Sequence, residues 1–175
     1  AALKIVEWVP GSLNADIGGG HAEFGTDFLR DQAVTNIVWD PFNRTNEHNA
    51  ESVGSIHSGG ADTATVTNVL NVIQEAANRD TVVAQAADAV GTHGTAYFQI
   101  YEGDASGRGR KTKAGKKDQT GYQNNRLAAT YVRGISKHFN NVTRIHRGTR
   151  TSTYQADNIP AQTKQARERP LPGMN

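Results

Sequence analysis

The stretch LNADIGGGHAEFGTDFL, residues 13–29, decides the fold. Residues 13–17 predict a short strand, and apolar residues recur at roughly helical spacing in residues 22–29. Three consecutive glycines, Gly18 to Gly20, separate these two segments. Residues 34–39 are apolar and β-branched, which predicts a second buried strand. The chain therefore opens with a strand, a glycine turn, a helix and a further strand.

The rest of the chain continues this alternation of strands and helices. We expect a short helix with loops in the polar residues 41–61, then a strand that runs into an apolar turn over 64–72 and a helix over 74–90. A strand over 96–101, a helix over 125–139 and strands over 141–146 and 150–154 should follow. Such a pattern favours an α/β fold with a doubly wound, mostly parallel sheet, helices on both faces and a C-terminal antiparallel hairpin. Residues 1–157 are expected to form a single domain, followed by a loosely ordered tail over 158–175.

The composition narrows the class of protein. Of the 175 residues, 36% are hydrophobic and 21% are charged, which is ordinary for a soluble protein, and the formal net charge is +2. The absence of cysteine excludes disulfides, thiolate zinc sites and a cysteine nucleophile. The six histidines show no metal-ligand spacing, so we expect no metal site. Because no apolar run reaches the roughly 20 residues of a membrane helix and no secretion signal is recognisable, we expect a cytoplasmic protein.

The glycine turn indicates a bound ligand, because ligands of such sheets bind at the carboxyl ends of the strands, where glycine lets the backbone approach them closely. A dinucleotide fingerprint needs glycines at relative positions one, three and six, but counting from Gly18 gives Gly20 and then Glu23. Glu23 would also repel a pyrophosphate at the helix N-terminus. No Gly-Lys-Ser/Thr follows, which excludes a phosphate loop. The turn therefore favours a ligand with cationic character.

The segment Asp16-Ile17-Gly18-Gly19-Gly20-His21-Ala22, together with Asp40 at the end of the next strand, resembles the first two motifs of class I S-adenosylmethionine-dependent methyltransferases. Gly18 and Gly20 match the family's alternating glycines, and Ala22 takes the third place. The resemblance implies a Rossmann-like fold and S-adenosylmethionine as cofactor. It also implies that Asp16 orients the turn and helps to hold the methionine ammonium. By the same resemblance Asp40, 22 residues after Gly18, binds the ribose hydroxyls.

A third match lies in residues 61–73, ADTATVTNVLNVI, which resemble the family's fourth strand. By that match, Asn68 faces the methionine part of the cofactor and Asp62 lies nearer the adenine. No strand pattern in residues 41–61 marks the family's third strand. From the residues alone, the glycines, Asp40 and Asn68 are also compatible with simple turn formation. The predicted cofactor-binding residues are Asp16, Gly18, Gly19, Gly20, Asp40, Pro41, Asp62 and Asn68.

The sequence identifies no catalytic residue. Methyl transfer from a sulfonium is an in-line displacement, so the enzyme mainly aligns the nucleophile with the methyl group. Amino-directed methyltransferases of the family carry an Asn/Asp-Pro-Pro-aromatic turn after the fourth strand, but this chain reads Asn68-Val69-Leu70-Asn71 there. This departure weakens the case for standard amino-directed DNA methylation, and the lack of cysteine rules out the cysteine mechanism at the cytosine carbon.

Residues 103–121 contain five glycines and predict a flexible basic loop that carries Arg108, Arg110, Lys111, Lys113, Lys116 and Lys117. Such side chains track phosphates, with Tyr122 and Arg126 nearby for stacking, so we expect a nucleic acid as partner; a solvated surface loop is the alternative. Substrate normally lies after the fifth strand in this fold, and a small-molecule acceptor is not excluded. The predicted substrate-binding residues are Tyr101, Glu102, Asp104, Arg108, Arg110, Lys111 and Tyr122.

Two other functions stay open on the sequence. An enzyme that cleaves S-adenosylmethionine would form methylthioadenosine or adenosine instead of S-adenosylhomocysteine. A non-catalytic module would use the fold as a scaffold and bind nucleic acid or protein through residues 103–121 without the cofactor. No oligomeric state follows from the sequence.

Overall fold

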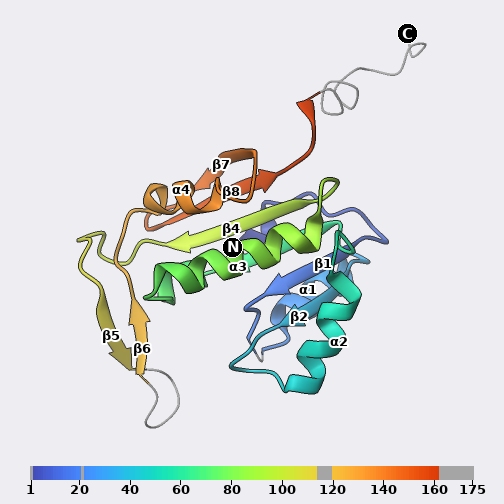
Figure 1. The fold of residues 1–175 in the computed structure, drawn as a ribbon, viewed down its shortest axis with the longest axis horizontal. Coiled ribbons are helices and arrows are strands. Elements are labelled where there is room, and N and C mark those ends of the chain that lie inside the picture. Colours follow the sequence, from blue (N-terminus) through green and yellow to red (C-terminus); the bar gives the residue numbers. More distant parts are fainter. Residues whose placement is uncertain (1, 21, 114–119, 162–175) are drawn as a thin grey trace.

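A six-stranded mixed sheet forms the centre of the molecule, with the strand order β2-β1-β3-β4-β8-β7 (Figure 1). The computed structural model describes residues 2–20, 22–113 and 120–161. Strands β1 to β4 are parallel, and β8 pairs antiparallel with both β4 and β7. The strand bounds are Leu13–Ile17 (β1), Thr35–Trp39 (β2), Thr63–Thr67 (β3), Thr95–Tyr101 (β4), Asn141–Arg147 (β7) and Thr151–Asp157 (β8).

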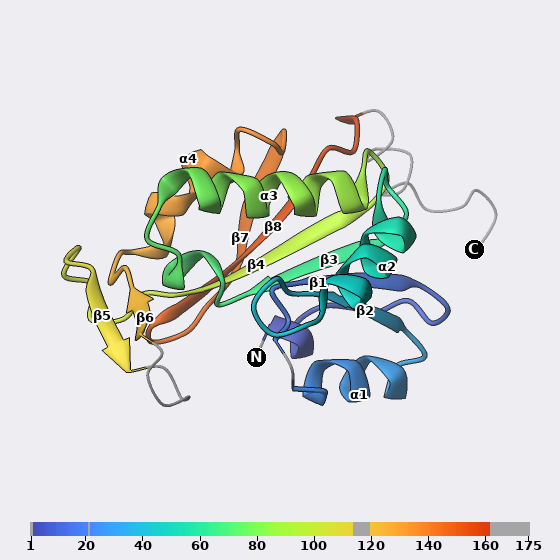
Figure 2. The same cartoon turned by 60° about the horizontal axis from the view of Figure 1, so that its bottom comes forward.

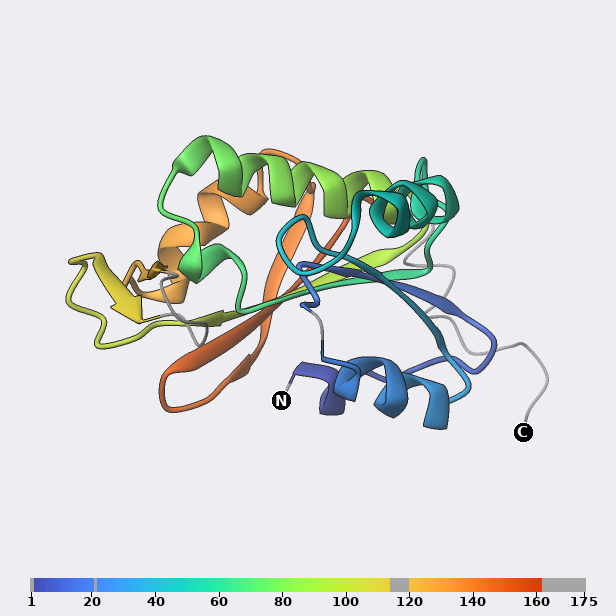
Figure 3. The same ribbon diagram turned by 90° about the horizontal axis from the view of Figure 1, so that it is seen from below.

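Helices cover both faces of the sheet (Figure 2, Figure 3). Helix α1 lies on one face, and α2, α3 and the short α4 lie on the other. Their bounds are Phe24–Asp31 (α1), Asn46–Ile56 (α2), Ala76–Val90 (α3) and Val132–Ile135 (α4). Short 3₁₀ segments are Ala2–Lys4, Leu70–Val72 and Ala128–Tyr131. None of the helices in the described part of the chain is both long and apolar enough to span a membrane.

The hydrophobic core includes the contact between the sheet and α3. Val66 of β3 and Phe98 of β4 are buried, as expected for parallel strands with both faces covered. Ala86 and Val90 lie four residues apart on α3 and belong to the same apolar cluster. Phe98 meets Phe139 edge to face, with 5.8 Å between the ring centroids. This packing holds α3 beside β3 and β4 and thereby fixes which residues of α3 reach the carboxyl ends of the strands.

The predicted fold class is confirmed, since the sheet is mostly parallel, has helices on both faces and ends in the antiparallel pair β7 and β8. Five further predictions hold to within a few residues: the strands over 34–39, 96–101, 141–146 and 150–154 and the helix over 74–90. Helix α2 leads directly into β3. The described residues therefore hold no strand in the place of the family's third strand.

The strand expected to run into an apolar turn over residues 64–72 is present, and the turn follows it. The strand ends at Thr67, because Asn68 takes a left-handed conformation, with a φ of +57°, that breaks the extended chain. The backbone N–H of Asn68 donates to the carbonyl oxygen of Gln99 on β4 at 2.8 Å, which holds this bend at the carboxyl edge of the sheet. A 3₁₀ turn, Leu70–Val72, follows.

The helix expected over 125–139 is shorter than predicted. Asn125 is buried and has a φ of +52°, so the chain is helical only over 128–135. Just before it, the buried side-chain amide of Asn124 binds the turn after β3. Its Nδ2 donates to the carbonyl oxygens of Leu70, Asn71 and Ile73, at 3.2, 3.0 and 2.8 Å.

The structure corrects the flexible loop expected over 103–121. Strands β5 (Arg110–Lys113) and β6 (Thr120–Gln123) form an antiparallel hairpin in which Lys111 pairs with Tyr122. Most side chains of β5 are exposed, so no apolar pattern marks the hairpin in the sequence. Lys116 and Lys117 lie outside the described residues, as do residues 162–175 of the predicted tail.

Candidate functional site

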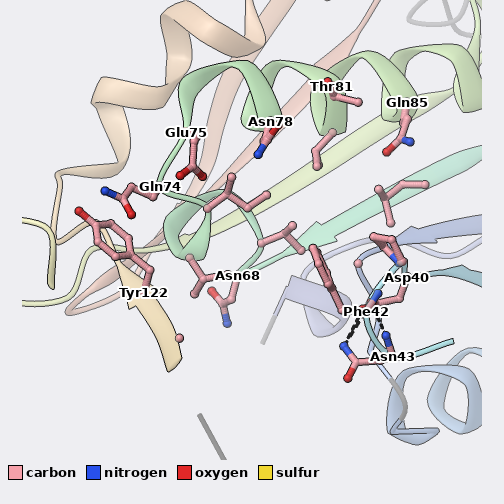
Figure 4. A pocket seen from close by; sticks show the side chains of 18 of the residues that line it. Asp40, Phe42, Asn43, Asn68, Gln74, Glu75, Asn78, Thr81, Gln85 and Tyr122 are labelled. Atoms are coloured by element: carbon pink, nitrogen blue, oxygen red, sulfur yellow. Dashed lines mark hydrogen bonds between the residues drawn. The ribbon is translucent and has the colours of Figure 1, made fainter. Parts of the chain in front are cut away.

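A pocket of about 690 Å³ opens at the carboxyl ends of the parallel strands (Figure 4). The glycine turn, the segment after β2, the bend after β3, the first turns of α3 and strand β6 all contribute to it. In Figure 4, Asp40 and Asn43 lie at one end, Tyr122 lies at the other, and Asn68 lies between them. This is the edge at which open α/β sheets bind ligands.

The glycine turn lines the pocket beside β1. Gly18 has a φ of +74°, and its N–H donates to the carbonyl oxygen of Trp39 at 2.7 Å. A Cβ on Gly18 would lie 2.7 Å from Cγ2 of Val69, so glycine is required there for both conformation and space. Gly20 has the same φ of +74°, but a Cβ there would meet nothing within 4 Å. At Gly20 the requirement is therefore conformational alone.

Asp40 follows β2 and is only 4% exposed. Its carboxylate accepts hydrogen bonds from the backbone N–H groups of Gly20, Phe42 and Asn43, each at 2.9 Å. The side-chain amide nitrogen of Asn43 lies 3.2 Å from both carboxylate oxygens. These donors occupy most of the lone-pair positions of a carboxylate. Asp40 therefore holds its own turn and the glycine turn together while it lines the pocket.

Asp16 lies against the glycine turn. A Cβ on Gly19 would be 2.5 Å from Oδ2 of Asp16, and Oδ1 accepts a hydrogen bond from Oγ1 of Thr65 at 3.1 Å. Burial raises the pKa of Asp16, the hydrogen bonds from Thr65 and Asn36 oppose that change, and the nearby charge of Asp40 reinforces it. A positively charged ligand group near the turn would favour the ionised form of Asp16.

The structure brings together most of the predicted cofactor-binding residues. Those that line the pocket are Gly18, Asp40, Pro41 and Asn68. Gly19, Gly20 and Asp16 build the turn behind it. The prediction for Asp62 is corrected by the structure. Asp62 precedes β3 at the amino ends of the parallel strands, where its carboxylate accepts from the backbone N–H of Leu13 at 2.8 Å. Asp62 therefore holds the start of β1 and does not line the pocket.

Three predicted substrate-binding residues follow or end β4 and do not line the pocket. Tyr101 is the last residue of β4. Glu102 is 5% exposed, and its carboxylate accepts from the backbone N–H of Ala128 at 2.9 Å, so it holds the start of the helical segment 128–135. Asp104 is exposed and accepts from the backbone N–H of Ser106 at 2.9 Å, within a local turn.

The remaining predicted substrate-binding residues lie on or just before the β5–β6 hairpin. Tyr122 lines the pocket. Arg108, Arg110, Lys111 and Lys113 are exposed to solvent, and Lys111 pairs directly with Tyr122. The hairpin thus contributes one aromatic side chain to the pocket and several cations to the adjoining surface.

The sequence did not predict the part of the pocket lining that α3 and the residue before it contribute. Glu75, Asn78 and Gln85 line the pocket (Figure 4). Asn78 and Gln85 are seven residues apart, so they lie on one helical face beside Val82. Oε1 of Gln85 is buried and has no hydrogen-bond partner in the described part of the chain. This polar stripe is visible in the sequence, but only the packing of α3 shows that it faces a pocket.

The pocket is acidic. Its described lining includes the carboxylates of Asp40 and Glu75, and no Lys or Arg. The other polar side chains are mostly uncharged amides, among them Asn43, Asn68 and Asn78. Carboxylates without a basic partner attract a cationic ligand and repel phosphates.

No protein-family model matches the sequence, and no curated protein matches it. Solved structures do match. A TehB-like S-adenosylmethionine-dependent methyltransferase from Corynebacterium glutamicum has a TM-score of 0.58 and 12% identity, over 89% of this chain and 86% of that one. A 16S rRNA methyltransferase from T. thermophilus, in complex with AdoMet and guanosine, has a TM-score of 0.53 and 12% identity, over 98% of this chain and 40% of that one. A protein described as a zinc-dependent alcohol dehydrogenase from Rhodobacter sphaeroides has a TM-score of 0.58 and 16% identity, over 85% of this chain and 84% of that one.

These similarities define the fold. Many of the matching structures are S-adenosylmethionine-dependent methyltransferases, and this chain has the Rossmann-like fold of class I methyltransferases. The identities are too low to carry an activity, and the dehydrogenase shares the fold. The choice of ligand therefore depends on the chemistry of the pocket.

Proposed function

We propose that this protein is an S-adenosylmethionine-dependent methyltransferase. The observation that carries the proposal is the charge of the pocket, whose described lining holds Asp40 and Glu75 but no Lys or Arg. S-adenosylmethionine carries a sulfonium and an ammonium, which an acidic pocket attracts. The glycine turn lies at the same edge and leaves the backbone accessible to a ligand.

The residues around the glycine turn fit this cofactor. Asp16 would stabilise the ammonium through the turn, and the carboxylate of Asp40 would accept hydrogen bonds from the ribose hydroxyls in place of the side-chain amide of Asn43. Gln85 offers an unpaired, buried acceptor to an amino group of the ligand. A side chain at Gly18 would collide with Val69, and its absence leaves the backbone of the glycine turn close to the ligand.

The cofactor supplies an electrophilic methyl group, and the protein's contribution is orientation, an effect worth up to about 7–11 kcal/mol. Asn68 lines the pocket between the Asp40 end and the Tyr122 end. Its left-handed backbone is held by the hydrogen bond to Gln99 of β4. Asn68 is thus a rigid element at the point where cofactor and acceptor would meet, with the acceptor on the Tyr122 side.

A dehydrogenase that binds a dinucleotide is the competing function for this fold. The third glycine of its fingerprint is replaced by Glu23, and Asp27 adds a second carboxylate in the first turn of α1. Arg44 lies against that turn, but it is paired with Glu23 at 2.7 Å and donates to the carbonyl oxygen of Gly20 at 2.9 Å. A pyrophosphate at this turn would face two carboxylates, and the arginine that the described residues place there is already paired.

A nucleic acid is the acceptor that we favour. Four exposed cations, Arg108, Arg110, Lys111 and Lys113, lie on or just before the hairpin whose Tyr122 lines the pocket. One of the solved structures with this fold is an rRNA methyltransferase. A small-molecule acceptor is the alternative, and it would enter the same end of the pocket without contacting the hairpin cations.

The direct test is methyl transfer from S-adenosylmethionine with a labelled methyl group to RNA, DNA and small-molecule acceptors. The proposal expects labelled acceptor and S-adenosylhomocysteine in equal amounts, loss of transfer in Asp40→Ala, and retained transfer in Asp62→Asn, whose carboxylate lies at the opposite edge of the sheet. Methylthioadenosine or adenosine as product would indicate a cleaving enzyme instead. Nucleic-acid binding by the wild type without any methyl transfer, unchanged in Asp40→Ala, would indicate a non-catalytic module.

A further inference from the structure

The β5–β6 hairpin projects from the body of the molecule beyond the start of α3 (Figure 2). Its strands pair with Lys111 opposite Tyr122 and Lys113 opposite Thr120. Opposite residues of an antiparallel pair have their side chains on the same face, and so do residues two apart. The side chains of Lys111, Lys113, Thr120 and Tyr122 therefore share one face of the hairpin. Thr120 and Tyr122 line the pocket, so this is the face next to it.

The opposite face of the hairpin is anchored to the body of the protein by buried amides. Gln123 is 8% exposed. Its Oε1 accepts from Nδ2 of Asn71 at 3.1 Å, and its Nε2 donates to the carbonyl oxygen of Tyr101 at 3.3 Å. The next residue, Asn124, donates its backbone N–H to the carbonyl oxygen of Asn71 at 2.9 Å. These bonds fix the orientation of the hairpin, so the face with Tyr122 and the lysines stays directed to the pocket side.

Charge is sharply divided between the hairpin and the pocket. Lys111 and Lys113 are exposed, and neither forms an ion pair with a described residue. No acidic residue occurs in residues 105–113. The pocket beside them holds Asp40 and Glu75. A polyanion can thus contact the hairpin, but its phosphates are repelled from the pocket, so only its uncharged bases can approach the acidic lining.

We propose that the acceptor is a single-stranded nucleic acid, whose phosphates contact Lys111 and Lys113 while one base stacks on Tyr122 at the mouth of the pocket. This inference rests on the proposed methyltransferase function and specifies its substrate. A base inside a duplex cannot reach the pocket without leaving the stack, whereas a single strand presents its bases freely. Aromatic stacking beside a row of cations is the usual means by which proteins hold single strands.

Fluorescence anisotropy with labelled oligonucleotides of about 12 nucleotides tests the proposal. The affinities for single-stranded RNA, single-stranded DNA and duplex DNA are measured over a range of salt concentrations. The double variant Lys111→Gln/Lys113→Gln should bind single strands at least about tenfold more weakly and reduce the slope of log affinity against log salt by about 1.4. Tyr122→Ala should lose about tenfold in affinity, and Tyr122→Phe should retain the wild-type affinity, because the ring is kept.

The matched control is Lys4→Gln/Arg30→Gln, which removes the same charge from the 3₁₀ segment Ala2–Lys4 and from α1. It should bind as the wild type does. Equal affinity for duplex and single strand would overturn the assignment to single strands. Binding that is insensitive to the Lys111/Lys113 pair would overturn the hairpin as the contact surface.

Calorimetry with S-adenosylmethionine separates this inference from the function on which it rests. Lys111 and Lys113 do not line the pocket, so the double variant should keep the cofactor affinity of the wild type. Unchanged cofactor binding with weakened single-strand binding supports the inference. Wild-type protein that binds single strands but no S-adenosylmethionine would overturn the methyltransferase function, while wild-type protein that binds S-adenosylmethionine but no single strand would overturn the inference alone.

Discussion

The carboxylate of Asp40 accepts a hydrogen bond from the backbone N–H of Gly20 at 2.9 Å, which joins the turn after β2 to the turn after β1. Asp40 is 4% exposed, and its removal would leave the partly buried backbone N–H groups of Gly20, Phe42 and Asn43 without this acceptor. We expect Asp40→Ala to lower the free energy of unfolding by about 2–4 kcal/mol and to weaken S-adenosylmethionine binding by more than about 1.5 kcal/mol. Urea denaturation and calorimetry measure the two effects. A folded Asp40→Ala variant with unchanged cofactor affinity would exclude the ribose assignment.

Asn43 offers a way to separate the structural role of Asp40 from its role as a ligand. The side-chain amide of Asn43 lies 3.2 Å from both carboxylate oxygens, at positions that the ribose hydroxyls would need. Asn43→Ala keeps the backbone hydrogen bond from residue 43 and frees those positions. We expect an S-adenosylmethionine affinity equal to or above that of the wild type, measured by calorimetry. A loss of about tenfold would mean that the amide itself contacts the cofactor.

Gly18 and Gly20 have the same φ of +74° but different surroundings, and they form a matched pair. Gly20→Ala should cost about 1–2 kcal/mol of stability from backbone strain alone. Gly18→Ala should cost about 1–3 kcal/mol more, because its Cβ would lie 2.7 Å from Cγ2 of Val69. Chemical denaturation of the two variants under identical conditions measures the difference. A Gly20→Ala variant less stable than Gly18→Ala would contradict the turn geometry.

The raised pKa of Asp16 makes the free energy of unfolding depend on pH. Because burial raises the pKa of Asp16 in the folded protein above its value in the unfolded chain, the stability linked to this group is full below the unfolded pKa and is lost as the pH rises through the folded pKa. Asp16→Asn removes that loss. The free energy of unfolding of Asp16→Asn, relative to the wild type, should therefore rise as the pH increases from the ordinary pKa of an aspartate, about 4, through the raised pKa of Asp16 in the folded protein. Urea denaturation at a series of pH values checks this, and a flat difference would argue against a buried, ionisable Asp16.

The same group links cofactor binding to pH. A ligand ammonium near the turn interacts more favourably with ionised than with neutral Asp16. We expect the S-adenosylmethionine affinity of the wild type to increase as the pH rises through the raised pKa of Asp16, and that of Asp16→Asn to change less. Calorimetric titrations of both proteins over the same pH series measure this. Identical pH profiles would mean that Asp16 does not respond to the cofactor.

The parallel strands and the glycine turn could be predicted because local physical rules determine them. Strands buried on both faces need apolar residues, and Gly18 and Gly20 adopt a backbone conformation that other residues rarely take. The position of Asp40 in the pocket could be predicted from its spacing to the turn. Asp62 was wrongly assigned to the pocket, because it precedes β3 at the amino ends of the strands, opposite the pocket. Whether a residue precedes or follows a parallel strand decides at which end of the sheet it lies.

The remaining features depend on tertiary contacts that leave no local pattern. The expected helix over 125–139 starts late because Asn125 takes a left-handed conformation, directly after Asn124, whose side chain binds carbonyl groups more than 50 residues earlier. The β5–β6 hairpin has mostly exposed side chains, and Gln123 anchors it through a buried amide. The polar stripe with Asn78 and Gln85 faces a pocket only because the apolar side of α3 packs on the sheet.

The central claim is that the acidic pocket at the glycine turn binds S-adenosylmethionine. Calorimetric titration of the purified protein with S-adenosylmethionine and, separately, with NAD tests it most directly. We expect micromolar affinity for S-adenosylmethionine, loss of that affinity in Asp40→Ala, and no binding of NAD, whose pyrophosphate would face Asp40 and Glu75 without a pocket cation. Binding of NAD in preference to S-adenosylmethionine, or binding of neither, would contradict the account.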